Sequence, residues 1–442
     1  MKDKNKNAIY GVITLAVLIV LIAVVTLLNN REMKVPVGTN NVVTTLMGEN
    51  QAEIDEKIKA DLEKNQYSLR DAKVYFNPYN VSPLGALIVF KTDKETAGKV
   101  IVKGKHGDDV TMHFEKDTYH YVPVYALYVD YENTVSIELD TGESKTFTIK
   151  TNHLEDVPRV AKNLSEESVL GNELYFISSP LDMTSYAFDK YGEVRWLTGE
   201  LYYHNIEFMD NGHLLIGTED ITDDGLASKI IEIDLLGRIY NEYTVEDGYL
   251  NSILLKKDGN IIVASKKKER DTYSDYLVEL DKNTGKIIKT WDVYALFESI
   301  DANYTNSLRA DYFYNSGIYL DEKDDNLVLT YWGGEFVLNL SYTEGTIKWL
   351  FANPANFSSA FRGVLLDVSP NFVYPKSMHS ASMEEGVLRV FDNGYSTLKG
   401  DEVTSHQKGL YSRAVQYSVG EKTITQLRSI DENKAFYSYA LG

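Results

Sequence analysis

The chain has 442 residues, of which 43% are hydrophobic and 12% aromatic, so it is long enough for two or three packed domains and is not a disordered protein. Its net charge of −20 argues against nucleic acid as a partner, because phosphate binding depends on clustered Lys and Arg. The absence of cysteine excludes disulfides, thiolate nucleophiles and Cys-ligated zinc. The 32 tyrosines favour an all-β fold, because tyrosine fits half-buried strands in which one end of the ring stays wet.

The first predicted element is a membrane anchor within residues 1–30. Residues 8–28 are apolar or small and carry no charge, and they follow a leader containing Lys2, Lys4 and Lys6. A stretch of this length spans a bilayer core. The alternative is a cleaved signal peptide, but no small-x-small cleavage motif follows the apolar run. We expect a single-pass protein of the cell membrane whose large domain lies outside the cytoplasm.

Residues 31–66 are predicted to form a linker with a short helix, because Ile54, Ile58 and Leu62 recur at helical spacing and make one narrow apolar stripe. From residue 67 to 152 the pattern changes to short strands between turns. The predicted strands are residues 86–90, 99–103, 110–114, 135–139 and 145–149. About ten residues per strand predicts a small β-sandwich domain.

From residue 153 to 442 the chain is repetitive. A strand–turn–strand phrase recurs, and its turn glycines Gly192, Gly237, Gly285 and Gly345 are 45, 48 and 60 residues apart. A second phrase, a turn followed by an apolar strand, recurs at residues 210–216, 258–263, 324–329 and 385–390. Four strands in about 40 to 50 residues are typical of one blade of a β-propeller.

The phrases predict about five blades, and residues 436–442 resemble the beginning of a further one. Three explanations stay open for this incomplete last blade. The propeller is smaller, or the chain closes with the strand before Thr198, or the sequence is truncated.

Two histidines occupy the same place in two copies of the second phrase. His204 lies 8 residues before the turn glycine Gly212, and His379 lies 7 residues before Gly386. Equivalent positions in successive blades point at one shared axis, so two imidazoles there are a candidate reaction centre. Counting back from the other turns adds Asn251 and the stretch 314–316 to the residues predicted to face the axis.

Three motifs carry a resemblance to a known family. They are Phe-Asn-Pro-Tyr-Asn-Val-Ser-Pro-Leu-Gly-Ala-Leu-Ile at 76–88, Met-His-Ser-Ala-Ser-Met at 378–383 with Val-Phe-Asp-Asn-Gly at 390–394, and Tyr-Ser-Arg-Ala-Val-Gln-Tyr at 411–417. From about Val74 to its end the chain resembles the bacterial arylsulfate sulfotransferases. That resemblance implies a small N-terminal β-domain before a six-bladed-type propeller.

The resemblance also implies an enzyme that transfers a sulfuryl group from a phenolic sulfate donor to a phenol acceptor, without a nucleotide sulfate donor or another cofactor. Consistently, the sequence has no Gly-x-x-x-x-Gly-Lys-Ser/Thr loop to cradle phosphates. By this resemblance His379 is the nucleophile and His204 assists it. A neutral imidazole can attack sulfur, and the sulfohistidine can then discharge onto an acceptor.

Three expected helper groups are replaced in this chain. The family pattern has His, Asn and Arg where the motifs place Tyr314, Ser316 and Trp332. Together with Asn251 these three are the predicted substrate-binding residues. Losing one fixed charge-stabilising contact typically costs about 3 to 4 kcal/mol of barrier.

The alternative is therefore a catalytically degenerate propeller that binds an aromatic or anionic ligand, or a protein partner, without turnover. No metal site is predicted, because two histidines without an adjacent pair of carboxylates fall short of a usual site.

Overall fold

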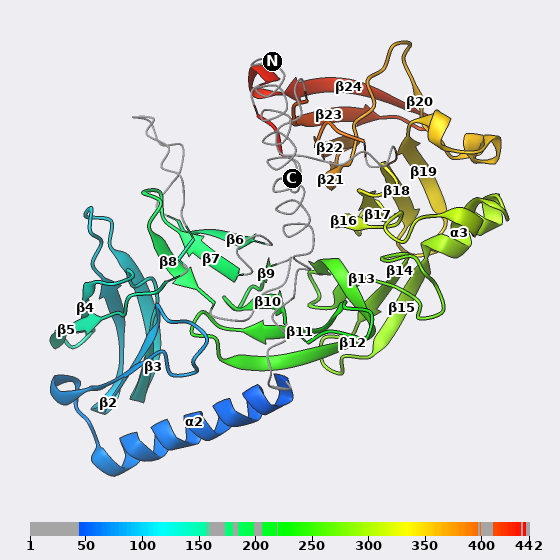
Figure 1. The fold of residues 1–442 in the computed structure, drawn as a ribbon. Helices are drawn as coiled ribbons and strands as arrows, with labels where there is room; N and C mark the ends of the chain where they lie inside the picture. Colours follow the sequence, from blue (N-terminus) through cyan, green and yellow to red (C-terminus); the bar gives the residue numbers. More distant parts are fainter. Residues whose placement is uncertain are drawn as a thin grey trace, which may run out of the picture. The chain divides into compact units, whose positions relative to one another are not determined.

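The computed structural model describes residues 44–155, 157–158, 173–179, 184–198, 206–218, 220–396, 398, 410–434 and 436–438 (Figure 1). The predicted anchor, residues 8–28, lies outside this part of the chain. Within the described residues, no helix has the length and hydropathy needed to cross a bilayer. The described part is dominated by antiparallel strands, so the predicted all-β class is confirmed.

The predicted helix is present as α2 (Thr44–Asn65). Its apolar stripe packs inward, because Ile58 and Leu62 are buried among side chains of the N-terminal sheet and of the sheet that begins with β9. Polar contacts fix the helix as well. The Gln51 side chain donates to Gly237 O at 2.9 Å and accepts from Ile239 N at 2.7 Å. The helix therefore packs on both the N-terminal sheet and the sheet that begins with β9, as Figure 1 shows.

The N-terminal strands form one five-stranded sheet: β1 (Lys73–Phe76), β2 (Ala86–Val102), β3 (Val110–Val124), β4 (Glu132–Leu139) and β5 (Ser144–Lys150). The separately predicted strands 86–90 and 99–103 are the two ends of the long strand β2. One end of β2 pairs with β1 and the other with β4, and irregular pairing with β3 separates the two ends. Its inward residues fill one continuous apolar core.

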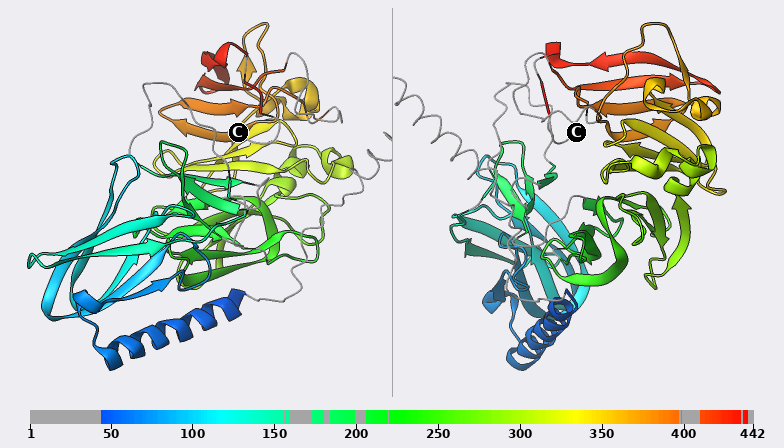
Figure 2. Two further views of the ribbon diagram at one scale, coloured as in Figure 1. Left: turned by 60° about the vertical axis from the view of Figure 1, so that its left-hand side comes forward. Right: turned by 45° about the vertical axis from the view of Figure 1, so that its right-hand side comes forward.

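After residue 173 the chain runs through successive antiparallel sheets, drawn from green to red in Figure 2. The first sheet contains β6 (Tyr175–Ser179), β7 (Thr184–Phe188) and β8 (Val194–Leu197). The next contains β9 (Ile206–Phe208), β10 (Leu214–Gly217), β11 (Ala227–Ile233), β12 (Ile239–Leu255), β13 (Ile261–Ser265), β14 (Tyr276–Leu280) and β15 (Ile287–Asp292). Strand β12 is shared: its first part pairs with β11 and its last part with β13. One long strand thus closes one four-stranded unit and opens the next.

Two more units follow. One contains β16 (Asn315–Asp321), β17 (Asn326–Tyr331), β18 (Phe336–Ser341) and β19 (Ile347–Ala352). The other contains β21 (His379–Glu384), β22 (Val387–Asp392), β23 (Arg413–Val419) and β24 (Thr423–Ile430), with β20 (Asp367–Val368) added parallel to β24. Short helices occupy the connections: α3 (Val293–Ile300), η2 (Tyr304–Ser307), η3 (Pro354–Asn356) and η4 (Ser359–Gly363).

The opening strands of successive units lie beside one another: β9 beside β12, β12 beside β16, and β16 beside β21. This is the arrangement of inner strands in a propeller, so the fold is propeller-like. The predicted turns are confirmed, because Gly192, Gly237, Gly285 and Gly345 all have positive φ. The predicted domain boundaries at 30, 66 and 152 stay predictions.

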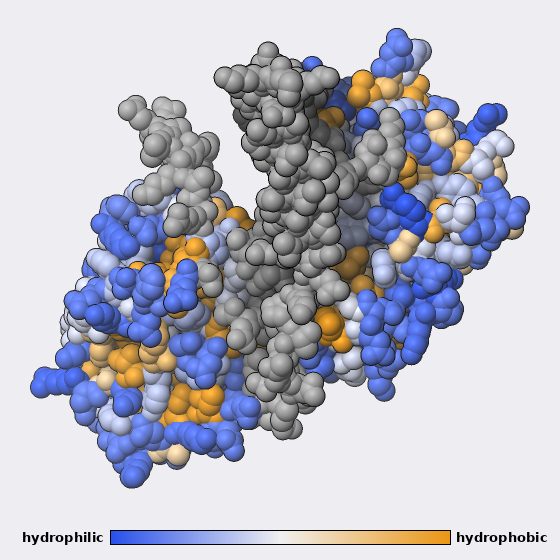
Figure 3. Space-filling view, viewed as in Figure 1, coloured by the Kyte–Doolittle hydropathy of each residue, from blue (hydrophilic) through white to orange (hydrophobic). Residues whose placement is uncertain are grey.

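Hydrophilic side chains cover most of the face drawn in Figure 3, with apolar patches over the N-terminal sheet. This distribution fits a chain with a net charge of −20, whose charged side chains remain in water while its strands bury their apolar faces.

We expect Gly237→Ala to destabilise the protein more than Gly285→Ala, although both glycines end the same kind of turn. Both have positive φ, which costs alanine about 1 kcal/mol. A Cβ on Gly237 would also lie 2.2 Å from Val81 Cβ, whereas the nearest atom at Gly285 is 3.9 Å away. That clash adds roughly 1–3 kcal/mol, which urea unfolding of both variants would measure. Equal losses of stability would contradict this account.

Candidate functional site

His379 lies at a bulge at the start of β21. It pairs with Phe391, but the next regular pair is Ser382 with Arg389, so the residues between are out of register. Two flanking serines have left-handed backbone, with φ of 44° at Ser377 and 50° at Ser380. Such conformations cost energy in non-glycine residues and persist only where the surroundings hold them. The backbone around His379 is thus held in an irregular conformation that departs from a regular strand.

His379 is 7% exposed, and its Nε2 atom has no hydrogen-bond partner among the residues that the structure describes. Burial lowers the pKa of the imidazole from 6.5 to about 4, because a charged ring would lose its hydration. The ring is therefore neutral at pH 7. A neutral imidazole with an unpartnered nitrogen can act as a nucleophile.

Strands β16 and β17 of the neighbouring sheet hold this bulge. Ser316 Oγ donates to Met378 O at 2.7 Å, and Ala381 N donates to Thr330 Oγ1 at 2.9 Å. Gly317 permits the approach, because a Cβ there would lie 2.9 Å from Ser380 Cα. Hydrogen bonds therefore flank His379 on both sides along the chain.

Strand β12 continues the same line of contacts. Asn251 Nδ2 donates to Asn315 O at 3.5 Å, and Ser252 Oγ donates to the same oxygen at 3.2 Å. Both β12 and β16 carry register shifts here, between residues 249 and 253 and between 315 and 317. The structure thus brings Asn251, Ser316 and His379 to one seam of inner strands.

Asn315 is a residue at this seam that counting from the turns did not single out. It pairs with Tyr331 as His379 pairs with Phe391, so the two residues are equivalent in register. Asn315 Oδ1 accepts from Gly317 N at 3.2 Å, and its fully buried Nδ2 meets no acceptor at hydrogen-bond geometry among the described residues, although the side chain is close enough to the Tyr331 hydroxyl to affect its pKa. Counting from the turns predicted the stretch 314–316, which contains Asn315, whereas the family motif selected its neighbours Tyr314 and Ser316.

Aromatic side chains gather on the same strands. The rings of Tyr314 and Trp332 are 5.4 Å apart, and Trp332 Nε1 donates to the Tyr395 hydroxyl at 3.0 Å. Tyr395 in turn connects to the His379 segment, because Ser377 Oγ donates to its backbone oxygen at 2.9 Å. Tyr395 was not predicted from the sequence, which carries no periodic signal for it.

Arg413 on β23 is a cation close in sequence to this segment, but it is already neutralised. Arg413 Nε lies 2.7 Å from Asp392 Oδ2, and both side chains are buried. Asp392 is the residue after Phe391, the partner of His379. Trp332, which stands where the resemblance expects Arg, brings an indole N–H and no charge.

His204 lies outside the described residues. The strand just after its position, β9, carries Glu207, whose pKa burial raises from 4.5 to about 7. Glu207 is therefore a proton-exchanging group near neutral pH on an inner strand.

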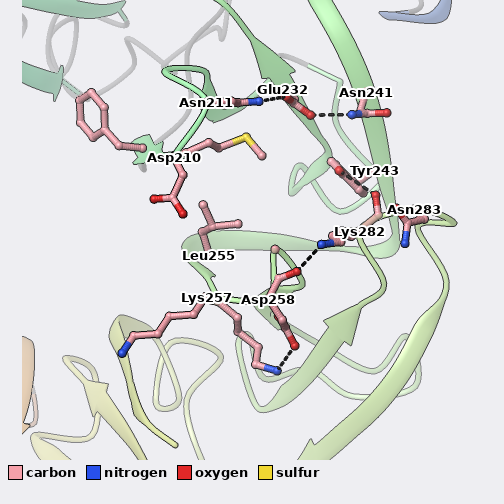
Figure 4. A pocket seen from close by; sticks show the side chains of 14 residues that line it. Asp210, Asn211, Glu232, Asn241, Tyr243, Leu255, Lys257, Asp258, Lys282 and Asn283 are labelled. Atoms are coloured by element: carbon pink, nitrogen blue, oxygen red, sulfur yellow. Dashed lines mark hydrogen bonds and ion pairs between the residues drawn. The ribbon is translucent and has the colours of Figure 1, made fainter.

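Two cavities lie near these strands without being lined by His379. One of about 220 Å³ is lined by Ser380 and Phe391 on the β21–β24 sheet. A second of about 580 Å³ lies at the turns between β9 and β10 and between β12 and β13, at the opposite ends of these strands (Figure 4). Its labelled side chains are mostly polar, including Asp210, Lys257 and Lys282.

Comparison with solved structures gives only distant likenesses. A protein of unknown function from Bacteroides caccae is 10% identical over 77% of this chain and 95% of its own, with a TM-score of 0.36. Dihydro-heme d1 dehydrogenase NirN is 11% identical over 83% and 67%, with a TM-score of 0.32. The WD40 propeller domain of Doa1 is 14% identical over 68% and 91%, with a TM-score of 0.31. Scores of this size are too low for any inference about this chain.

No curated protein matches the chain. Two family models do. The arylsulfotransferase Ig-like domain matches residues 73–153, and the arylsulfotransferase (ASST) model matches residues 160–442, which is more than half of the chain. With both regions matched in order, the chain belongs to the arylsulfotransferase family of sulfotransferase enzymes.

Proposed function

We propose that this protein transfers a sulfuryl group from one phenol to another through a covalent intermediate on His379, without a nucleotide sulfate donor. The family in general uses phenolic sulfate donors and phenol acceptors. The observation that carries the proposal is the buried imidazole of His379, with its unpartnered Nε2 and its low pKa.

In the first half-reaction, the Nε2 lone pair attacks the sulfur of an aryl sulfate. The N–S bond forms, the S–O bond to the aryl group breaks, and the electron pair leaves with the phenolate. Burial favours this step, because a ring that stays neutral keeps its lone pair available at neutral pH. The anchored backbone on both sides of His379 supports a fixed direction of attack.

In the second half-reaction, the oxygen of an acceptor phenol attacks the same sulfur. The new S–O bond forms, the N–S bond breaks, and the acceptor proton passes to a base. His204 is proposed for that assistance from the family resemblance. Glu207, two residues into the strand after it on the inner side of the sheets, is a second group that exchanges protons near pH 7.

The proposed substrate-binding residues are Asn251, Tyr314, Ser316 and Trp332. The rings of Tyr314 and Trp332 suit an aryl group, since aromatic pairs gain energy at offset or tilted geometry. Asn315 is added here, because its buried amide nitrogen can donate to a sulfuryl oxygen or to the leaving phenolate. Ser316 already donates to Met378 O, so its contribution is to hold the His379 backbone.

The sequence also supports a six-bladed-type propeller with an incomplete last blade, and a membrane anchor that keeps the large domain outside the cytoplasm. These remain proposals. The repeated four-stranded units support the first, and the uncharged residues 8–28 support the second.

A specific observation favours a second candidate, a propeller that binds an aromatic or anionic ligand without turnover. Trp332 replaces the expected cation and its N–H is bound to Tyr395, while Arg413 is neutralised by Asp392. Neither group is then available as a cation to stabilise developing negative charge, which predicts slow turnover.

We expect the full chain, incubated with 4-nitrophenyl sulfate and phenol, to release nitrophenolate, and His379→Ala to abolish this release. Removing the nucleophile removes the covalent route, so the rate should fall at least about a thousandfold, as for other essential catalytic residues. Absorbance of nitrophenolate measures the rate.

The matched control is His153→Ala, because the His153 side chain is 73% exposed and lies in the segment after the N-terminal sheet. It should keep the wild-type rate. A folded wild type without any release would favour the binding function, and unchanged release by His379→Ala would exclude His379 as the nucleophile.

We expect the pH dependence of the protein's stability to reflect the low pKa of His379. The unfolded chain takes up this proton near pH 6.5, whereas the folded chain does so only near pH 4. As the pH falls from about 6.5 to about 4, this difference lowers the free energy of unfolding by about 3 kcal/mol in total. Urea unfolding at pH 7 and pH 4 should show a smaller loss for His379→Gln than for the wild type. Equal losses would mean that His379 titrates normally.

A further inference from the structure

A separate cavity, open to solvent, lies far along the chain from His379, where α2, the N-terminal sheet and strands β11 and β12 meet. This cavity of about 590 Å³ has the size of a small-molecule site. Four tyrosines line it, together with Asp55 of α2 and the turn residues Asp234 and Arg238. The tyrosines are Tyr79, Tyr121, Tyr125 and Tyr240.

Asp234 is the first residue of the turn between β11 and β12. It accepts hydrogen bonds from Leu236 N at 2.9 Å and Arg238 N at 3.0 Å, and from the Tyr240 hydroxyl at 3.2 Å. Within the described part of the chain it forms no ion pair. Burial raises its pKa, because the carboxylate loses hydration without gaining a cation.

The aspartates of the equivalent turns in the neighbouring four-stranded units have different surroundings. Asp189 is neutralised by Arg195, at 3.0 Å. Asp281 has its pKa lowered, first by its hydrogen bond with the Thr284 side chain. Among the described residues Asp281 forms no ion pair either, so Asp234 differs from Asp281 in being desolvated by burial, and from Asp189 in lacking an arginine partner.

The cations around the cavity do not compensate for this charge. Arg238 Nε lies 2.6 Å from Asp55 Oδ2, so it is already paired. His213 also lines the cavity, but its Nδ1 lies 2.5 Å from the carboxylate of Glu232, which is outside the lining. The lining holds three carboxylates, Asp55, Glu56 and Asp234, against Lys59 and Arg238, which leaves one net negative charge.

The tyrosine rings could contact an organic cation that carries methyl or methylene groups. The Tyr125 hydroxyl has no hydrogen-bond partner within the described residues, and burial followed by the Asp234 charge raises its pKa, which places the two groups in the same environment. Tyr240 is held in place by His213, with ring centroids 4.1 Å apart, and by Arg238 at 4.4 Å. Tyrosine rings attract quaternary and other organic ammonium groups through their negative faces.

We propose that this cavity binds a small organic cation, a quaternary ammonium group or an amine, with its charge toward Asp234 and its methyl or methylene groups against the tyrosine rings. The site is separate from the sulfotransferase centre. The proposal does not depend on the chemistry assigned to His379.

Titration calorimetry of the full chain with choline, and with its uncharged isostere 3,3-dimethyl-1-butanol, tests the proposal. Choline should bind saturably and at least about tenfold more tightly than the isostere. Asp234→Asn should weaken choline binding about tenfold or more, because asparagine keeps the oxygen that accepts the two turn N–H groups but removes the charge.

The matched control is Asp281→Asn, the same change in the next turn of this kind, which should bind choline like the wild type. Tyr121→Leu provides a second variant that should fold, because Tyr121 is 40% exposed, and it should weaken choline binding several-fold. Nitrophenolate release should be unchanged in Asp234→Asn, which separates this test from that of His379. Absence of saturable choline binding, equal binding of the isostere, or wild-type affinity in both Asp234→Asn and Tyr121→Leu would overturn the proposal.

Discussion

The close approach of β16 and β21 is the constraint on which the candidate site depends. At Gly317 the two backbones come so near that no Cβ fits beside Ser380, and hydrogen bonds from Ser316 and to Thr330 fix the bulge from both sides. These contacts surround the two left-handed residues on either side of His379, Ser377 and Ser380. The local strain is thus supported by contacts between sheets, as is typical of functional sites.

The same seam explains why His379 stays neutral. Packing between neighbouring inner strands excludes water from the imidazole, and burial without a nearby carboxylate is the sole cause of its lowered pKa. The seam continues through Asn315 to Asn251, so each sheet contributes one polar side chain or backbone group to its neighbour. Positioning and electrostatics at this site therefore have one structural origin.

Strand β12 and helix α2 connect the N-terminal sheet and the first propeller-like units. Strand β12 belongs to two consecutive units, and α2 packs on both the N-terminal sheet and the next one. The tyrosine-lined cavity lies at this joint, between α2, the N-terminal sheet and the β11–β12 turn. Its unpaired Asp234 derives from a turn that the sequence uses repeatedly for purely structural reasons.

The sequence alone determined the all-β class, a helix within residues 31–66, the recurring turns and the choice of His379 as a candidate, because periodicity, turn glycines and family motifs are local patterns. It did not determine that residues 86–102 form one strand, since the course of a strand through a bend depends on pairing with distant residues. Nor could it single out Asn315 or Tyr395, whose places depend on bulges and on contacts between sheets. Burial, and with it the low pKa of His379 and the unpaired charge of Asp234, was decided by tertiary structure, because desolvation depends on neighbours that the linear chain does not specify.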